Sequence, residues 1–244
     1  SSNAVGEYTI EPFLKYKGIN SIDYWFLSHM DLDHVSGILE LLETGYSINN
    51  IVLSSEIPMD DTLAKLIELA NRNNSRIIYM KQGDICGTKH LRFKCIYPYQ
   101  GASSDDINAL SLGLLMEYDS DADTKVDYAG FFGGDLGAEE EEWIAESGLI
   151  GHINLLKVSH HGSRYSSDSS FLTVTSPDVA VISCGAKNRY GHPADEAVLR
   201  LSETCDQLYY TMYSGRIRCT PGNVETFIGN KCMLKPDFLS GKQK

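Results

Sequence analysis

The sequence contains no long apolar run, no excess of positive charge and no paired cysteine motif. None of its apolar stretches approaches the roughly 18 to 20 residues of a membrane-spanning helix. Its 21 basic residues face 33 acidic ones, which gives a formal net charge of −12. This balance argues against a surface that coats nucleic acid through clustered cations. It does not exclude an enzyme in which a bound metal ion supplies positive charge locally.

The six cysteines are scattered along the chain and form no C-x-x-C pair. Three of them, Cys95, Cys184 and Cys219, lie in apolar runs typical of strands. Buried free thiols are the simplest interpretation, and they favour a reducing compartment such as the cytoplasm. No signal peptide is visible, but residues 1–4 (SSNA) are typical of a cleaved tag, so this absence carries little weight.

Residues 5–244 predict a single domain, because hydrophobic periods run nearly from end to end with only short polar breaks. With 42% hydrophobic residues the chain can build a core without disulfides or metal clips. Strand patterns alternate with helical patterns, and hairpin-like pairs are mixed among them. We therefore expect an α/β fold with a mixed sheet, or with two sheets and helices outside.

Hydrophobic periodicity gives the expected positions of the elements. Helices are expected at 35–45, 60–74, 138–148, 167–175 and 192–205. Strands are expected at 22–28, 51–55, 76–80, 91–98, 111–118, 126–134, 153–159 and 178–185. The tail, 207–229, predicts two or three antiparallel strands.

Histidines and aspartates gather where the expected strands end. Four of them lie within six residues after the first strand: His29, Asp31, Asp33 and His34. Asp135 ends a later strand, the pair His160–His161 ends another, and His192 lies in the loop after a third. Because side chains at neighbouring strand ends converge on one edge of a sheet, we expect these residues to form one site.

Imidazole and carboxylate groups together suit zinc, manganese or iron. Two ions about 3.5 to 4 Å apart need several ligands and usually a bridging carboxylate. A tight loop at 29–34 could wrap its four side chains around one or two ions. His90 and His152 have no acidic or histidine neighbours, and we interpret them as ordinary surface or strand residues.

Three other patterns are interpreted as structural. Residues 119–127 imitate the start of a calcium-binding loop, but Thr124 replaces the required glycine and Gly130 the required glutamate. This segment therefore predicts a solvated hairpin turn. The acidic run 139–142 predicts a solvated helix face, and Ser159 lacks the G-x-S-x-G surroundings of a nucleophile.

The segment SHMDLDHVSGI resembles the H-x-[HD]-x-D-H metal-binding motif of the metallo-β-lactamase superfamily. KVSHHGS together with NRYGHP is more specific and is similar to the hydrolase domain of ComEC-type competence (DNA-internalisation) proteins and their stand-alone relatives. NALSLGLLMEY and GGDLG add to the likeness, which covers roughly residues 10–220. The first motif alone marks only the superfamily.

The resemblance implies an αββα sandwich with a site for one or two divalent ions, zinc or manganese, at one edge. It implies that His29 and Asp31 belong to the first metal, that Asp33 and His34 belong to the second, and that Asp135 bridges. One of His160 and His161 would complete the second site, and which one stays open. Asn108 and Ser111 stand where most superfamily members offer a further histidine, so the first site is expected to be weak.

The oxygen-rich ligand set shifts the expected metal from zinc towards manganese. Asp33 is a candidate to orient the metal-activated hydroxide or to accept its proton, and His161 or His192 to donate to the leaving group. Other side chains near the motifs are candidate contacts to substrate or to the ligands: Asn108, Ser111, Lys157, Ser163, Arg164 and Arg189.

The favoured function is a metal-dependent phosphodiesterase of the nuclease type, acting on an anionic substrate such as single-stranded DNA. One alternative is a hydrolase of a small-molecule ester or phosphoester. Another is a binding module of the same fold with a degraded site. As part of a longer ComEC-type protein, the chain would lie on the extracytoplasmic face of a membrane.

The position of the first motif adds a further expectation. Domains of this superfamily begin with several strands ahead of the first histidine, and these are expected to be missing here. A sheet edge exposed in this way would favour a homodimer.

Overall fold

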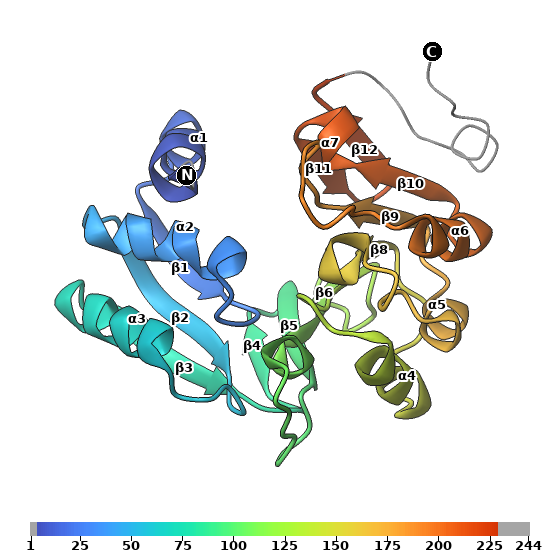
Figure 1. Cartoon of the computed structure of the whole chain (residues 1–244), viewed down its shortest axis with the longest axis horizontal. Helices are drawn as coiled ribbons and strands as arrows, with labels where there is room; N and C mark the ends of the chain where they lie inside the picture. Colours follow the sequence, from blue (N-terminus) through green and yellow to red (C-terminus); the bar gives the residue numbers. More distant parts are fainter. Residues whose placement is uncertain (1–3, 229–244) are drawn as a thin grey trace. The chain divides into compact units, whose positions relative to one another are not determined.

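The computed structural model describes residues 4–228, which fall into two compact units (Figure 1). Unit 1 contains residues up to 82 together with 98–112, and unit 2 contains 83–97 together with the residues from 113 onward. Residues 1–3 of the expected tag remnant and Cys232 lie outside the described residues. That residues 5–244 form one domain stays a prediction.

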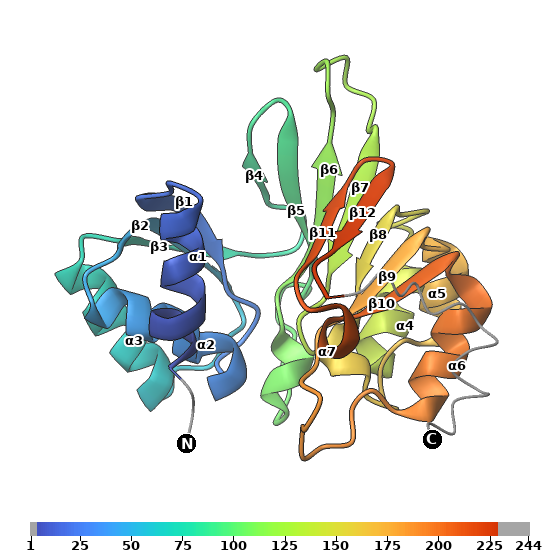
Figure 2. The same cartoon turned by 90° about the horizontal axis from the view of Figure 1, so that it is seen from above.

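Unit 1 is built on a parallel sheet in the order β1-β2-β3. Two helices connect these strands and lie on one face of the sheet (Figure 2). Leu41 of the first helix, Leu66 of the second and Ile51 of the central strand are fully buried between them. The elements are β1 (Ser21–Phe26), α2 (Leu32–Glu43), β2 (Ser47–Ser54), α3 (Asp61–Arg72) and β3 (Arg76–Met80).

Helix α2 begins three residues earlier than predicted. Asp31 has extended backbone angles and is the N-cap, and its carbonyl accepts the amides of His34 and Val35, both at 2.9 Å. Asp33 and His34 therefore lie on the first helical turn rather than in a loop. The predicted start of α3 is confirmed, because the Asp60 carboxylate accepts the Leu63 amide at 2.7 Å.

Two further parts of unit 1 were not predicted. The helical segments η1 (Gly6–Ile10) and α1 (Glu11–Tyr16) precede β1, and the short helix η2 (Ile107–Leu110) lies in the segment 98–112. That segment returns to the end of β1, where the Leu112 amide donates to the Ser28 carbonyl at 2.9 Å. It therefore belongs to the surroundings of the first histidine motif.

Unit 2 is built on a mixed sheet in the order β10-β9-β8-β7-β6-β5-β4. A mixed sheet is one of the two arrangements that the sequence predicts. Neighbours from β4 to β7 are antiparallel, and neighbours from β7 to β10 are parallel. The strands are β4 (Ile85–Gly87), β5 (Leu91–Tyr97), β6 (Gly113–Tyr118), β7 (Tyr128–Phe132), β8 (Leu155–Lys157), β9 (Val179–Ile182) and β10 (Gln207–Tyr210).

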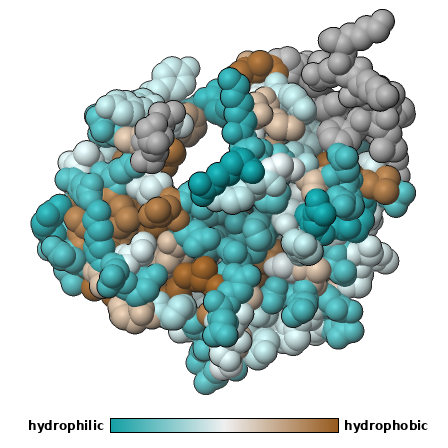
Figure 3. Space-filling model, viewed as in Figure 1, coloured by the Kyte–Doolittle hydropathy of each residue, from teal (hydrophilic) through white to brown (hydrophobic). Residues whose placement is uncertain are grey.

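Three helices cover one face of this sheet: α4 (Ala138–Glu146), α5 (Ser169–Thr175) and α6 (Asp195–Thr204) (Figure 2). Phe131 of β7, Ile144 of α4, Phe171 of α5 and Leu201 of α6 are fully buried in the core between helices and sheet. In the view of Figure 3, hydrophilic side chains cover much of the described surface, with smaller hydrophobic patches between them.

The prediction for the tail is wrong in part. β10 pairs in parallel with β9 and is followed by the short helix α7 (Thr211–Ser214). The Thr211 hydroxyl bonds both the amide and the carbonyl of Cys184, which ties the chain to the end of β9 and stops the strand. Within the described part of the tail, the antiparallel pair consists of β11 (Ile217–Thr220) and β12 (Asn223–Thr226).

The segment 119–127 is the turn of the β6–β7 hairpin, as predicted. The buried Asp119 carboxylate accepts the amides of Asp123 and Thr124, so it serves the turn itself. His90 bonds the Asp119 carbonyl and His152 lies 3.0 Å from the Asp178 carboxylate, which fits their structural interpretation. Within residues 4–228 no helix combines the length and apolar character of a membrane span.

The prediction of a solvated acidic face on α4 is wrong for Glu141. Its side chain is 1% exposed, because it lies one turn before Ile144 on the face towards the core. Its carboxylate accepts the amide of Asp168 at 2.8 Å. Burial raises the pKa of Glu141 to about 7.

The raised pKa of Glu141 predicts a pH-dependent stability. Because the folded chain keeps this proton up to pH 7 while the unfolded chain loses it near 4.5, the stabilisation is complete below pH 4.5 and is lost as the pH rises to 7. We expect this loss to reach at most about 3 kcal/mol, and Glu141→Gln to abolish it. Urea unfolding of the wild type, Glu141→Gln and the exposed control Glu142→Gln from pH 4 to 8 measures it. Identical pH profiles for all three would contradict the assignment.

Candidate metal centre

The first donor set lies in unit 1, between the end of β1 and the first turn of α2. It consists of His29, Asp31, Asp33 and His34. The His29 side chain is completely buried, His34 is partly buried, and Asp33 is exposed on the first turn of α2. The helix dipole favours the Asp33 carboxylate there without a bound cation.

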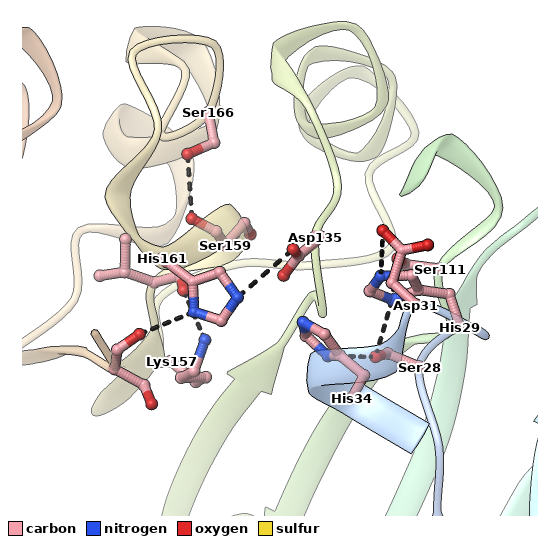
Figure 4. Close-up of polar contacts among 12 residues, drawn as sticks. Ser28, His29, Asp31, His34, Ser111, Asp135, Lys157, Ser159, His161 and Ser166 are labelled. Carbon is pink, nitrogen blue, oxygen red and sulfur yellow. Dashed lines mark hydrogen bonds and ion pairs between the residues drawn. The ribbon is translucent and has the colours of Figure 1, made fainter. Parts of the chain in front are cut away.

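Serine hydroxyls orient both imidazole rings of this set (Figure 4). The Ser28 Oγ atom lies 3.1 Å from His29 Nδ1 and 3.1 Å from His34 Nδ1, and the Ser111 Oγ atom lies 3.2 Å from His29 Nδ1. A hydroxyl oxygen can accept a hydrogen bond from each of two rings. With both Nδ1 atoms donating, each Nε2 atom carries the lone pair that a metal ligand needs.

The separation between His29 and Asp31 suits two ligands of one ion. The His29 Nε2 atom lies 3.8 Å from Asp31 Oδ2, which is longer than a hydrogen bond. Two donors about 2.1 Å from one tetrahedral ion lie about 3.4 Å apart. Asp31 makes no side-chain bond to the first turn of α2, although it occupies the N-cap position.

The second donor set lies in unit 2 and consists of Asp135, His160, His161 and His192. Asp135 follows β7 after Gly133 and Gly134 and is 4% exposed. A Cβ atom at Gly133 would lie 2.7 Å from Ser159 Oγ, and Gly134 has φ +59°. The two glycines therefore let this turn pass close to the segment that carries the histidine pair.

Hydrogen bonding distinguishes the two histidines of the pair. His161 Nδ1 lies 2.7 Å from the Ser183 carbonyl, so this nitrogen carries the proton, and Nε2 lies 3.5 Å from Asp135 Oδ2 (Figure 4). Histidines that bind metal through one ring nitrogen commonly donate the other ring N–H to a backbone carbonyl in this way. The His160 ring instead meets the His192 ring edge-on, with centroids 5.8 Å apart.

His192 is held by its own loop. The Asn188 side chain accepts the His192 amide at 2.8 Å and donates to its carbonyl at 2.6 Å. Burial lowers the pKa of His192, and the neighbouring His160 and His161 lower it further. The Tyr190 ring stacks on His192, and Arg189 contacts Tyr190 rather than the histidines.

Lys157 supplies a positive charge beside this set. Its ammonium group donates to the Val158 carbonyl at 2.8 Å (Figure 4). Burial lowers the pKa of Lys157, while the negative charge of Asp135 acts in the opposite direction. The role of Lys157 as a contact to an anionic substrate stays a prediction.

The remaining predicted residues have mixed surroundings. Ser111 contacts His29, and the buried Oδ1 atom of Asn108 has no hydrogen-bond partner among the described residues. Ser163 is buried and accepts the Tyr165 amide at 3.3 Å, so it serves its own loop. Arg164 is exposed and lies 3.8 Å from Glu196.

Two contributors were missed in the sequence. Ser28 precedes His29 directly and contacts both rings of the first set, and Ser183 contributes a backbone carbonyl from the end of β9. Adjacency to the motif was an available signal for Ser28. For Ser183 the sequence holds no signal, because every residue has a carbonyl.

Comparison of the sequence with family models gives no match. The chain is similar to three curated proteins: 29% identical over 88% of its length to ComE operon protein 3 of Bacillus subtilis (strain 168), 26% over 88% to Recombination protein 2 of Haemophilus influenzae, and 25% over 88% to Competence protein ComA of Neisseria gonorrhoeae. It spans only 26%, 24% and 28% of these relatives.

The fold is similar to that of CmlA, a diiron β-hydroxylase from Streptomyces venezuelae, with a TM-score of 0.52 and 10% sequence identity. The match covers 85% of this chain and 45% of CmlA. At this identity the likeness concerns the fold alone. Together with the parallel and mixed sheets described above, it confirms the predicted fold class. The chain therefore has the α/β fold of the metallo-β-lactamase type, and its sequence resembles a segment of the ComEC-type competence proteins.

Proposed function

We propose that this chain is a metal-dependent hydrolase that cleaves phosphodiester bonds. One observation carries the proposal: a histidine in each donor set has its Nδ1 atom next to a protein oxygen and its Nε2 atom facing a carboxylate. His29 faces Asp31 at 3.8 Å, and His161 faces Asp135 at 3.5 Å. Imidazole and carboxylate donors arranged in this way suit a divalent cation.

We further propose a set of ligands for one or two divalent ions. The proposed ligands follow the superfamily motif, with Asp135 as the bridging carboxylate: His29, Asp31, Asp33, His34, Asp135 and His161. His160, whose ring packs against His192, is then a substrate contact rather than a ligand.

Manganese is the proposed metal. Three of the six proposed ligands are carboxylates, and the hydroxyl of Ser111 contacts His29 in the segment where a further histidine would otherwise be expected. Oxygen donors favour Mn²⁺, whereas nitrogen and sulfur donors favour Zn²⁺.

A bound divalent ion would lower the pKa of a coordinated water and stabilise negative charge on the substrate. The chain's own residues would do the rest. Asp33, exposed on the first turn of α2, would accept the proton of the attacking water. Lys157 would contribute positive charge near Asp135. His192, whose pKa is lowered, would act as a neutral hydrogen-bond donor to a substrate oxygen.

Single-stranded DNA is the proposed substrate. Two relatives carry the names Recombination protein 2 and Competence protein ComA, and recombination and competence are processes that involve DNA. The net charge of −12 argues against extensive coating of a duplex, but it leaves room for a short strand at a metal centre.

The choice of His161 over His160 as ligand predicts unequal losses of metal. His161→Ala removes the Nε2 donor atom of a ring that is oriented by a hydrogen bond from Nδ1 to the Ser183 carbonyl. It should therefore lower the affinity for Mn²⁺ by at least about 10-fold. His160→Ala should keep the metal affinity within about 2-fold and lower turnover instead. Metal content after dialysis and calorimetric titration measure both. A larger loss of metal in His160→Ala than in His161→Ala would reverse the assignment.

The proposed activity predicts Mn²⁺-dependent cleavage that needs Asp135. Metal-stripped protein reloaded with Mn²⁺ should degrade a single-stranded oligonucleotide faster than protein reloaded with Zn²⁺. Asp135→Asn should lower the rate at least about 100-fold, since the bridging carboxylate is lost. Asp206→Asn makes the same change at an exposed position of unit 2 and should leave the rate unchanged.

A small chromogenic phosphodiester, assayed in parallel, separates the alternatives. Turnover of this compound without cleavage of the oligonucleotide would replace DNA by a small-molecule phosphoester. Bound metal without turnover of either substrate would instead indicate a binding module. Greater activity with Zn²⁺ would overturn the choice of manganese.

A further inference from the structure

The loop that carries the histidine pair has an unfavourable backbone. We call residues 159–168 the histidine loop. His160 has φ 49°, His161 has φ 54° and Ser167 has φ 60°. In this left-handed region the Cβ atom crowds the backbone carbonyl, so residues other than glycine adopt it only where the surroundings hold them there.

The side chain of Arg200 in α6 binds the histidine loop at three backbone carbonyls. Its Nε atom donates to the Ser167 carbonyl at 2.8 Å. Its Nη2 atom donates to the carbonyls of Ser166 at 2.8 Å and Arg164 at 2.9 Å. One planar guanidinium therefore fixes three carbonyls within four residues, which a single ammonium group cannot do with the same geometry.

Other side chains also hold the loop. The Ser166 hydroxyl donates to the Ser159 and Ser163 carbonyls inside the loop. The Glu141 carboxylate accepts the Asp168 amide at its end and also the Ser167 amide. At the start of the loop, His161 Nδ1 lies against the Ser183 carbonyl. Between these points Arg200 binds the carbonyls of Arg164, Ser166 and Ser167, and the Ala138 amide binds the Tyr165 carbonyl at 2.7 Å.

We propose that Arg200 is a positioning residue for His161. By binding the carbonyls of Arg164, Ser166 and Ser167 it keeps the preceding left-handed turn in place. This turn directs the His161 ring between the Ser183 carbonyl and Asp135. The inference deepens the proposed function, because it assigns to α6 the control of a metal ligand on another segment. Arg200 itself touches neither substrate nor metal in this role.

The tautomer of His161 gives a test that needs neither metal nor activity. In nitrogen-15 NMR spectra of metal-free protein, the wild type should show a protected Nδ1–H signal, assigned by its absence from His161→Ala. Arg200→Met should lose this signal or average it between tautomers. Arg92→Met, which removes an arginine paired with Glu117 in the same unit, should keep it.

Metal affinity gives the second measurement. The probe is Zn²⁺, which both imidazole and carboxylate groups bind. Calorimetric titration should show about 10- to 100-fold weaker binding of Zn²⁺ in Arg200→Met than in the wild type, the range for loss of a group that orients a ligand. The Zn²⁺ affinity of Arg200→Lys should lie between those of Arg200→Met and the wild type, because an ammonium group replaces only some of the guanidinium N–H donors. Arg92→Met should bind like the wild type.

The outcomes separate this inference from the proposed function. A wild-type tautomer signal in Arg200→Met would overturn the role of Arg200, whether or not the protein binds metal. If Arg200→Met does not fold, Arg200→Lys decides, and a wild-type signal with wild-type affinity in that variant overturns the role equally. If the wild type binds no metal but Arg200→Met loses the Nδ1–H signal as expected, the metal centre is refuted. Arg200 then remains the residue that orients His161.

Discussion

The candidate site depends on hydrogen bonds to the Nδ1 atoms of its histidines. A neutral imidazole ring has one donor and one acceptor nitrogen, so a bond at Nδ1 decides which atom faces the ligand. In unit 1 the hydroxyls of Ser28 and Ser111 lie against these atoms, and in unit 2 the Ser183 carbonyl does. The start of α2, the glycine turn before Asp135 and the histidine loop place the rings so that their Nδ1 atoms meet these oxygens.

Much of this organisation was predictable from the sequence, because strand ends carry the polar residues of α/β proteins. The motif at 29–34 follows β1, Asp135 follows β7, and the histidine pair follows β8. The mixed sheet of unit 2 was predictable for a similar reason, since hairpin and helix-connected patterns leave different spacings. Both features depend on residues that are close together in the sequence, and hydrophobic periodicity reports on such short stretches.

The errors arose where tertiary contacts override local pattern. An acidic run predicts exposure, but Glu141 lies on the core face of α4 and binds the Asp168 amide. The tail predicts two or three antiparallel strands, but β10 ends where Thr211 bonds the backbone of Cys184, and it pairs in parallel with β9. Likewise, nothing near Arg200 in the sequence points to the histidine loop, which lies more than thirty residues earlier.

The path of the chain has a consequence for its synthesis. Ser111, which contacts His29, follows it by 82 positions and belongs to the segment 98–112 that returns to unit 1 after β5. On the ribosome, the first histidine therefore emerges long before one of its two serine neighbours. Unit 1 can reach its final form only after β4 and β5 of unit 2 have been made, so neither unit can be completed as an uninterrupted stretch of nascent chain.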